Sequence, residues 1–284
     1  MTTRTSASDL ILRLYLAIFF IYLLLPLAVM GIATFNTSKF PTVTPWLGTT
    51  TQWFGALMAD NQMWVGLTNS VIVGIAVILI SVPIGVAAAM LLDGVHRRAK
   101  SMLYAVMVSP LLTPGVIIGI STLVFWDRLG VKGGLHLSVI GQSSFIIAYV
   151  MLMVSARLQR FDRTLEEAAL DLGGTHMQVF RRILFPYLKP AVFAGAVLAF
   201  FQSFENYNTT LFTRGTDVTL TVYIASKVRT GLTPAVNALA LILIAITIAG
   251  AIAYEISRRQ AAAEAAAAKK RAAEADTMAE LKIA

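Results

Sequence analysis

Six apolar stretches, each about 20 residues long or longer, make up most of this chain and dictate the solvent in which it folds. They lie at about 13–35, 65–92, 102–125, 138–156, 190–212 and 235–256. An α-helix needs about 20 apolar residues to cross the roughly 30 Å hydrocarbon layer of a membrane. A backbone in lipid must satisfy its hydrogen bonds internally, so each stretch is expected to be helical. The sequence therefore predicts an all-α integral membrane protein with six transmembrane helices.

The composition and the scarcity of reactive side chains narrow the function classes. Hydrophobic residues make up 57% of the chain and charged residues 13%, whereas soluble domains carry about 25% charged residues. The chain has no cysteine, which excludes disulfides and thiolate metal sites. The three histidines, His96, His136 and His176, lie far apart in predicted loops. Neither a metal site nor a catalytic base is predicted, so a membrane-embedded enzyme is disfavoured.

The distribution of basic residues predicts the orientation. With the N-terminus inside, the inner segments 1–13, 93–101, 157–189 and 257–284 hold 17 of the 23 Lys and Arg residues. Basic residues concentrate in cytoplasmic loops. Both termini are therefore predicted to be cytoplasmic. The net charge of +8 mostly reflects this bias, and no nucleic-acid partner is predicted.

We expect one transmembrane domain over residues 1–284, with its core at about 13–256, because no soluble domain, linker or convincing repeat interrupts the pattern. Residues 257–284 are rich in strong helix formers but have no sustained apolar stripe. They predict a cytosolic helical extension of the last transmembrane helix. In the third stretch, Pro110 and Pro114 predict a kink or local opening, since proline removes a backbone donor and clashes with the preceding turn.

A polar segment at about 164–186 separates the fourth and fifth stretches on the predicted cytoplasmic side. Leu165, Ala169 and Leu172 fall at i, i+4 and i+7, which places them on one face of a short helix. Gly173 and the glycine after it end this helix, because glycine accepts the left-handed conformation found at helix ends. The face is a shallow apolar ridge ringed by charge, of the kind that inserts into a groove on a partner.

A second short helix is predicted immediately afterwards. Thr175 is followed three residues later by Gln178, which is the spacing of a capping box at a helix start. Pro186 and Pro190 are expected to close this helix. The segment should thus form two short helices that meet at a bend beneath the membrane.

The residues of this segment resemble the EAA loop of binding-protein-dependent ABC importer permeases. The family pattern is EAA, three residues, Gly, nine residues, then Ile, any residue, Leu and Pro. The matching positions are Glu167, Ala168, Ala169, Gly173, Ile183 and Pro186. Phe185 stands where the family usually has Leu, a mild apolar departure. Further stretches at 35–38, 68–90 and 233–244 resemble the spermidine/putrescine permease group, in particular its second permease subunit.

The resemblance implies a type I ABC importer permease fold and a multi-pass subunit of the bacterial inner membrane. It implies that the loop inserts into a cleft of an ATPase subunit and couples ATP hydrolysis to transport. The predicted coupling residues are Glu167, Ala168, Ala169, Asp171, Leu172 and Gly173. It also implies a second permease chain, two ATPase subunits and an external solute-binding protein. The sequence contains no GxxxxGK[ST] phosphate loop, so ATP and Mg²⁺ are expected on the ATPase chain and no cofactor on this one.

The fifth stretch contains an unusual acidic residue, Glu205. At about 1.5 Å per residue, this carboxylate lies roughly 22 Å along the helix from its cytosolic end. Ionised groups inside a membrane cost at least ~2–3 kcal/mol unless they are paired or wet. Gln202, Glu205, Asn206 and Asn208 are therefore predicted to line a substrate pathway. Glu205 either pairs with the partner permease or meets a cationic solute such as a polyamine.

Several alternatives remain open on the sequence. The same machinery serves other solutes in related systems, such as an opine, a phosphonate, iron or a quaternary amine. A stand-alone channel or ion-driven secondary transporter is a rival from another class. Such a transporter usually shows repeated halves around a midplane site, and neither repeats nor several buried charges are evident. The favoured prediction is an ATP-driven importer that works by alternating access, with no covalent chemistry on this chain.

Overall fold

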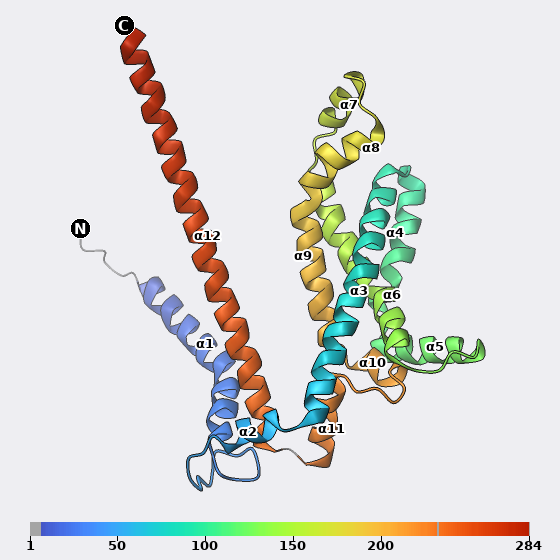
Figure 1. Cartoon of the computed structure of the whole chain (residues 1–284), viewed down its shortest axis with the longest axis vertical. Helices are drawn as coiled ribbons and strands as arrows, with labels where there is room; N and C mark the ends of the chain where they lie inside the picture. Colours follow the sequence, from blue (N-terminus) through green and yellow to red (C-terminus); the bar gives the residue numbers. More distant parts are fainter. Residues whose placement is uncertain (1–6, 232, 284) are drawn as a thin grey trace. The chain divides into compact units, whose positions relative to one another are not determined.

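The computed structural model describes residues 7–231 and 233–283 (Figure 1). Within these ranges the regular elements are helical, apart from one isolated bridge between Asn36 and Thr49. The chain divides into two compact units, one of residues 60–230 and one of residues 1–59 with 231–284. The all-α prediction is confirmed.

The larger unit, residues 60–230, is built around three long helices that pack against one another. Its helices are α3 (Asn61–Gly94), α4 (Arg97–Leu112), α5 (Gly115–Arg128), α6 (Leu135–Leu158), α7 (Thr164–Asp171), α8 (His176–Val179), a π-helical segment (Phe180–Leu184), α9 (Phe185–Phe204), α10 (Asn208–Thr213) and α11 (Leu220–Thr230). Helices α3, α6 and α9 share one apolar core that includes Val77, Val150 and Leu188.

A Cβ at Gly85 would lie 2.7 Å from the Cβ of Val150. Glycine there lets α3 approach α6, as small residues do between membrane helices.

The third apolar stretch does not form one kinked helix. Helices α4 and α5 meet at an angle of 98°. Thr113 lies between them in an extended conformation, with ψ of 128°, because a residue that precedes a proline is disfavoured in the α region. Among residues 7–231 and 233–283, five other helices are long and apolar enough to span a membrane, and this broken pair makes six when it counts as one span.

The prediction that Pro186 and Pro190 close the second short helix is wrong. Helical structure is continuous from His176 to Phe204. Proline lacks a donor and clashes with the carbonyl four residues back, but the wider π-helical turn at Phe180–Leu184 ends two residues before Pro186. The cytoplasmic segment is thus joined directly to α9.

The fifth apolar stretch is also not one helix, contrary to the prediction. Helix α9 ends at Phe204 and α10 begins at Asn208. The side chain of Asn206 accepts hydrogen bonds from the backbone N–H groups of Thr209, at 3.1 Å, and Thr210, at 3.3 Å. These bonds satisfy N–H groups in the first turn of α10 that have no partner within the helix, and they favour a new helix start over continuation of α9.

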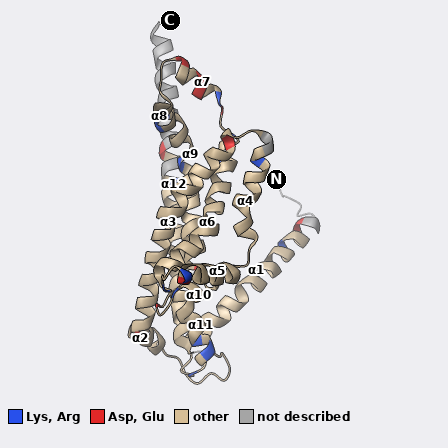
Figure 2. Ribbon diagram, turned by 90° about the vertical axis from the view of Figure 1, so that its right-hand side faces the viewer, with Lys and Arg blue, Asp and Glu red and all other residues tan. Residues whose placement is uncertain are grey.

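Within residues 60–230, the segments predicted to be inside and outside lie at opposite ends of the helices (Figure 1). At one end, Arg163 forms an ion pair with Asp93 at the end of α3. At the other, Asn69 Nδ2 donates to the carbonyl of Val218 at 2.8 Å. Figure 2 shows charged residues near these ends, with long uncharged lengths of α3, α6 and α9 between them. The arrangement agrees with the alternation inferred from basic residues.

The smaller unit contains α1 (Ala7–Thr34), α2 (Gln52–Met58) and α12 (Pro234–Ile283), and both α1 and α2 pack on α12. Its loop is organised by Asn36, whose Nδ2 donates to the carbonyls of Thr42 and Pro45, both at 3.0 Å. Helix α12 continues through the predicted tail as far as Ile283.

Candidate functional site

The cytoplasmic segment, residues 164–186, is held in shape by local hydrogen bonds. Helix α7 ends with N–H bonds from Gly173 to the carbonyl of Leu170, at 2.9 Å, and from Gly174 to that of Ala169, at 3.0 Å. This pair of bonds is the Schellman motif. Gly173 has φ of +83°, and a Cβ at Gly174 would lie 2.7 Å from the Ala169 oxygen. Both glycines are therefore required by the turn.

The predicted capping box at the start of α8 is confirmed. The N–H of Gln178 donates to Thr175 Oγ1 at 3.3 Å, and the N–H of Thr175 donates to Gln178 Oε1 at 2.9 Å. Because the cap follows the Schellman turn directly, the bend between α7 and α8 is specified on both sides. The loop thereby presents a defined surface.

The predicted coupling residues lie together on this loop. Glu167, Ala168, Asp171, Leu172 and Gly173 are exposed, and Ala169 is half-buried. Leu172 is 90% exposed, which is costly for an apolar side chain in water. A hollow beside it is lined by Ala169, Leu172, Gly174, Gln178, Val179, Arg182 and Ile183. The exposed Leu172 side chain thus lies next to a small hollow. Acidic residues on α7 and the basic pair Arg181 and Arg182 lie nearby along the chain. Such a surface is suited to contact with another protein.

The two chain segments that enter and leave this loop are joined at its base. Arg157 Nε donates to the carbonyl of Tyr187, and Tyr187 Oη donates to the carbonyl of Arg157, both at 3.3 Å. The Arg157 guanidinium lies 4.3 Å from the centre of the Tyr187 ring. The Phe161 ring packs on the Tyr187 ring, with the ring centroids 5.0 Å apart. Residue spacing gives no signal for this pair, because its members lie thirty positions apart.

At the opposite end of the same unit, a buried polar cluster surrounds Gln142. This residue is 1% exposed. Its Nε2 donates to Thr210 Oγ1 at 2.8 Å, and its Oε1 accepts from Ser203 Oγ at 2.5 Å. Thr210 Oγ1 in turn lies 3.3 Å from Asn206 Oδ1. The cluster ties α6 to α9 and α10. Gln142 is the only amide side chain in the fourth apolar stretch. This isolated polar residue is the sign of the cluster that the sequence offers.

The predicted pathway residues fall at the end of α9, in the break that follows it and at the start of α10. Glu205 caps the end of α9 and is exposed, as is Asn208. Gln202 is half-buried. Asn206 is half-buried, and its Oδ1 is used to cap α10. The four residues therefore do not share one helix, because the helix breaks after Phe204; that they line a substrate pathway stays a prediction. Glu205 instead continues an exposed face of α9 that carries Phe193, Val197 and Phe201 at intervals of four residues.

A second charged group lies at this end of the unit. Asp60 caps α3, accepts from Tyr223 Oη at 2.8 Å and lies 3.1 Å from Lys227 Nζ. Burial alone would raise the pKa of Asp60, but the hydrogen bonds from Tyr223 and Lys227 hold it below its ordinary value. Burial and the adjacent carboxylate raise the pKa of Tyr223, so the phenol remains a donor. The group joins α11 to the start of α3.

The comparisons with known proteins agree with this architecture. Residues 53–262 match the family described as the binding-protein-dependent transport system inner membrane component. The chain is 35% identical to the putrescine transport system permease protein PotI of Escherichia coli K12, over 84% of this chain and 88% of that protein. It is 29% identical to the spermidine/putrescine transport system permease protein PotC of the same strain, over 86% and 92% of the two chains.

A solved structure shares the fold. It is a bacterial ABC transporter involved in the import of the acidic polysaccharide alginate, with a TM-score of 0.64 and 16% identity. The match covers 89% of this chain and 98% of that chain. Taken with the family match and the helices long enough to span a membrane, these likenesses show that the chain is a multi-pass membrane protein and belongs to the family of inner membrane permease components of binding-protein-dependent transport systems.

Proposed function

We propose that this chain is a permease subunit of an ATP-driven importer of the bacterial inner membrane, and that its solute is a small polyamine-like cation. The observation that supports the machinery most strongly is the loop at 164–186, which has a defined shape and an exposed apolar residue at its tip. The 35% identity to a putrescine permease supports the solute class. In the assembly, the chain pairs with a second permease and works with two ATPase subunits and an external binding protein.

The loop is the element through which the ATPase acts. Leu172 inserts into a groove of the ATPase subunit, in the helix-in-groove mode of recognition, while Glu167 and Asp171 lie beside it. Helical structure runs without a break from α8 through the π-helical turn into α9. A displacement of the loop is therefore passed directly to α9. Nucleotide-driven closure of the ATPase pair changes the packing of the permease helices, and access alternates between the two sides.

Glu205 is the residue of this chain that attracts the cation. Its carboxylate is exposed at the end of α9, in line with Phe193, Val197 and Phe201. No hydrogen bond or ion pair engages this side chain within the described ranges 7–231 and 233–283. A negative charge beside apolar surface attracts an ammonium group more strongly than it would in bulk water, since the local dielectric constant is lower.

The experiment is uptake of radiolabelled putrescine into proteoliposomes that contain the complete transporter, with ATP hydrolysis measured in the same samples. Glu167→Ala should lower uptake at least tenfold while the protein remains in the membrane, and the remaining ATP hydrolysis should no longer depend on solute. Glu264→Ala removes an exposed acid from the α12 tail and serves as the matched control. Uptake that is equal in the two variants would reject the docking role of the loop.

The solute class is tested separately. Glu205→Gln should raise the concentration of putrescine that gives half-maximal uptake several-fold and leave assembly with the ATPase unchanged. An unaltered concentration dependence would remove Glu205 from the pathway. Uptake of a neutral solute in place of putrescine by the unmodified transporter would contradict the cation assignment and leave the coupling role intact.

A further inference from the structure

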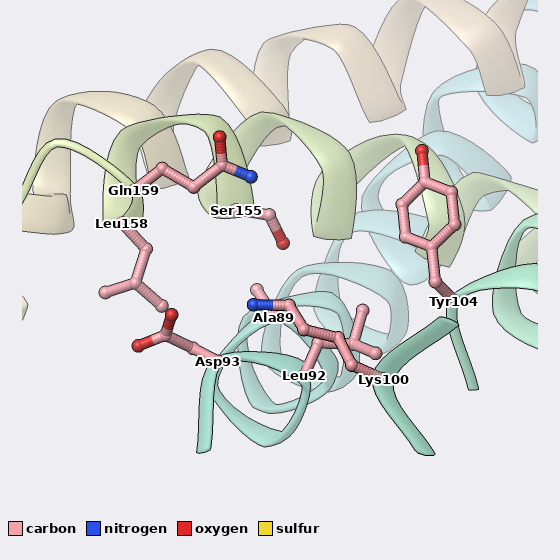
Figure 3. A pocket seen from close by; sticks show the side chains of 8 residues that line it. All are labelled: Ala89, Leu92, Asp93, Lys100, Tyr104, Ser155, Leu158 and Gln159. Atoms are coloured by element: carbon pink, nitrogen blue, oxygen red, sulfur yellow. The ribbon is translucent and has the colours of Figure 1, made fainter. Parts of the chain in front are cut away.

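A small cavity at the inner end of residues 60–230 belongs neither to the loop at 164–186 nor to the polar cluster around Gln142. It lies between the end of α3, the first turns of α4 and the end of α6 (Figure 3). Its lining residues are Ala89, Leu92, Asp93, Lys100, Tyr104, Ser155, Leu158 and Gln159. Its volume is about 40 Å³, whereas one water needs about 10–15 Å³ on the same measure. The space admits a compact polar group that is larger than one water molecule.

The polar side chains of this cavity are mostly hydrogen-bond donors without partners. The Ser155 hydroxyl is buried and unpaired. The side chains of Lys100, Tyr104 and Gln159 also make no hydrogen bond or ion pair with any residue that the structure describes. Figure 3 shows the Lys100 ammonium and the Ser155 hydroxyl directed into the same space. A buried donor such as the Ser155 hydroxyl is normally satisfied, and the half-buried Lys100 lies beside it, while Tyr104 and Gln159 are exposed at the rim. The arrangement indicates an acceptor-rich ligand.

The charge at this site favours an anion. Lys100 is half-buried, and desolvation strengthens its attraction for an opposite charge. The one acid in the lining, Asp93, is already paired with Arg163. The local balance around the cavity therefore leaves the Lys100 charge uncompensated.

The surroundings of the cavity are those of a membrane lipid. The cavity lies at the end of α3 and α6 that is predicted to face the cytoplasm. Helix α4 leads away from it and has no buried residue among those whose side chains are described. Met102 and Leu112 on this helix are 73% and 82% exposed. They are separated by ten residues, about 15 Å of helix at 1.5 Å per residue, which is a length of apolar surface that an acyl chain can follow.

We propose that this cavity binds the phosphate group of a phospholipid from the inner leaflet. Lys100 supplies the charge and Ser155 a hydrogen bond, while Tyr104 and Gln159 contact the headgroup at the rim. The acyl chains lie along the exposed face of α4. Basic pockets between transmembrane helices on the cytoplasmic side recognise headgroups in this way.

The test is native mass spectrometry of the full-length chain in detergent, titrated with phosphatidylglycerol. Lys100→Met should weaken the apparent affinity at least tenfold, and Ser155→Ala about threefold. Lys132→Met removes an exposed lysine from the opposite end of the same unit and should bind as the unmodified chain does. Lys100→Arg should restore most of the affinity. Diacylglycerol, which lacks the phosphate, should not compete with phosphatidylglycerol.

The result that overturns the proposal is equal lipid retention by Lys100→Met, Ser155→Ala and Lys132→Met. Ser155→Ala removes only one hydroxyl group, so its outcome does not depend on whether the lysine variant folds. Binding of inorganic phosphate that requires Lys100, without selective binding of phosphatidylglycerol, would assign the cavity to a soluble anion and refute the lipid.

Discussion

Arg157 and Tyr187 bind each other reciprocally at the base of the loop at 164–186, each donating a hydrogen bond to the other's backbone carbonyl at 3.3 Å. Arg157 lies at the end of α6, and Tyr187 in the first turn of α9. The pair closes the loop between them, so that α6 and α9 are joined where residues 164–186 begin and end. On the function proposed above, this relationship would convert a local contact with an ATPase into movement of α6 and α9 together.

Tyr187→Phe tests the reciprocal pair. The substitution keeps the ring beneath the guanidinium and against Phe161 but removes the bond to the Arg157 carbonyl, which is worth about 0.5–1.5 kcal/mol. We expect a small loss of thermal stability and a several-fold fall in solute transported per ATP hydrolysed. Tyr254→Phe, at an exposed position of α12, is the control. An unchanged ratio of transport to hydrolysis would show that the pair is only structural.

Gly174→Ala tests whether the turn between α7 and α8 must have its observed shape. An added Cβ would meet the Ala169 oxygen at 2.7 Å, so the Schellman hydrogen bonds would be displaced. We expect the assembled permease to bind the ATPase about tenfold more weakly, equivalent to about 1.4 kcal/mol. Gly250→Ala in α12, where a Cβ would meet nothing within 4 Å, is the matched control. Equal affinities in a binding titration would contradict this account of the loop.

Gln142→Leu tests the buried polar cluster. The side chains are similar in size, but leucine leaves the Ser203 hydroxyl buried without its acceptor, at a cost of about 1–3 kcal/mol. Thermal unfolding in detergent should show a lower midpoint for Gln142→Leu than for Gln62→Leu, which changes an exposed residue of α3. A midpoint equal to that of the unmodified protein would mean that the cluster does not stabilise the junction of α6, α9 and α10.

Asp60 predicts a dependence of stability on pH. Its pKa in the folded protein lies below the ordinary value of 3.8. The ionised carboxylate therefore stabilises the fold fully above that pH, and the contribution is lost as the pH falls through the folded-state pKa. Asp60→Asn keeps a capping side chain but loses the ion pair with Lys227, at about 0.5–1 kcal/mol for a partly exposed pair. The difference in unfolding midpoint between the two proteins should be present at pH 7 and shrink towards pH 3. A constant difference would exclude the ion pair as its cause.

The sequence predicted the features that depend on neighbouring residues. The bend at Gly173 and Gly174 and the cap formed by Thr175 and Gln178 involve contacts within a few positions, so residue types and spacing were sufficient. The apolar stretches predicted the helices, since lipid imposes helical structure on them. The family resemblance on the loop was confirmed by the match over residues 53–262.

The other features of the fold depend on contacts that the spacing of residues in the sequence does not reveal. Pro186 does not end its helix, because a π-helical turn precedes it and buried Leu184 and Leu188 hold the helix against the core. The average hydropathy of the fifth stretch hides the break after Phe204, where Asn206 caps α10. Gln142 and Ser203 are sixty-one positions apart, so their hydrogen bond was visible only in the folded structure.

The central claim is that an ATPase binds the loop at 164–186, and the absence of native cysteine makes a direct test possible. Leu172→Cys places one thiol at the exposed tip of the loop, and Leu112→Cys places one at the end of α4, where Leu112 is 82% exposed. In membranes that contain the assembled transporter, a short thiol-reactive cross-linker should join the Leu172→Cys chain, and not the Leu112→Cys chain, to the ATP-hydrolysing subunit. Failure of the Leu172→Cys chain to cross-link, or its labelling by a membrane-impermeant reagent from the outside, would contradict the account.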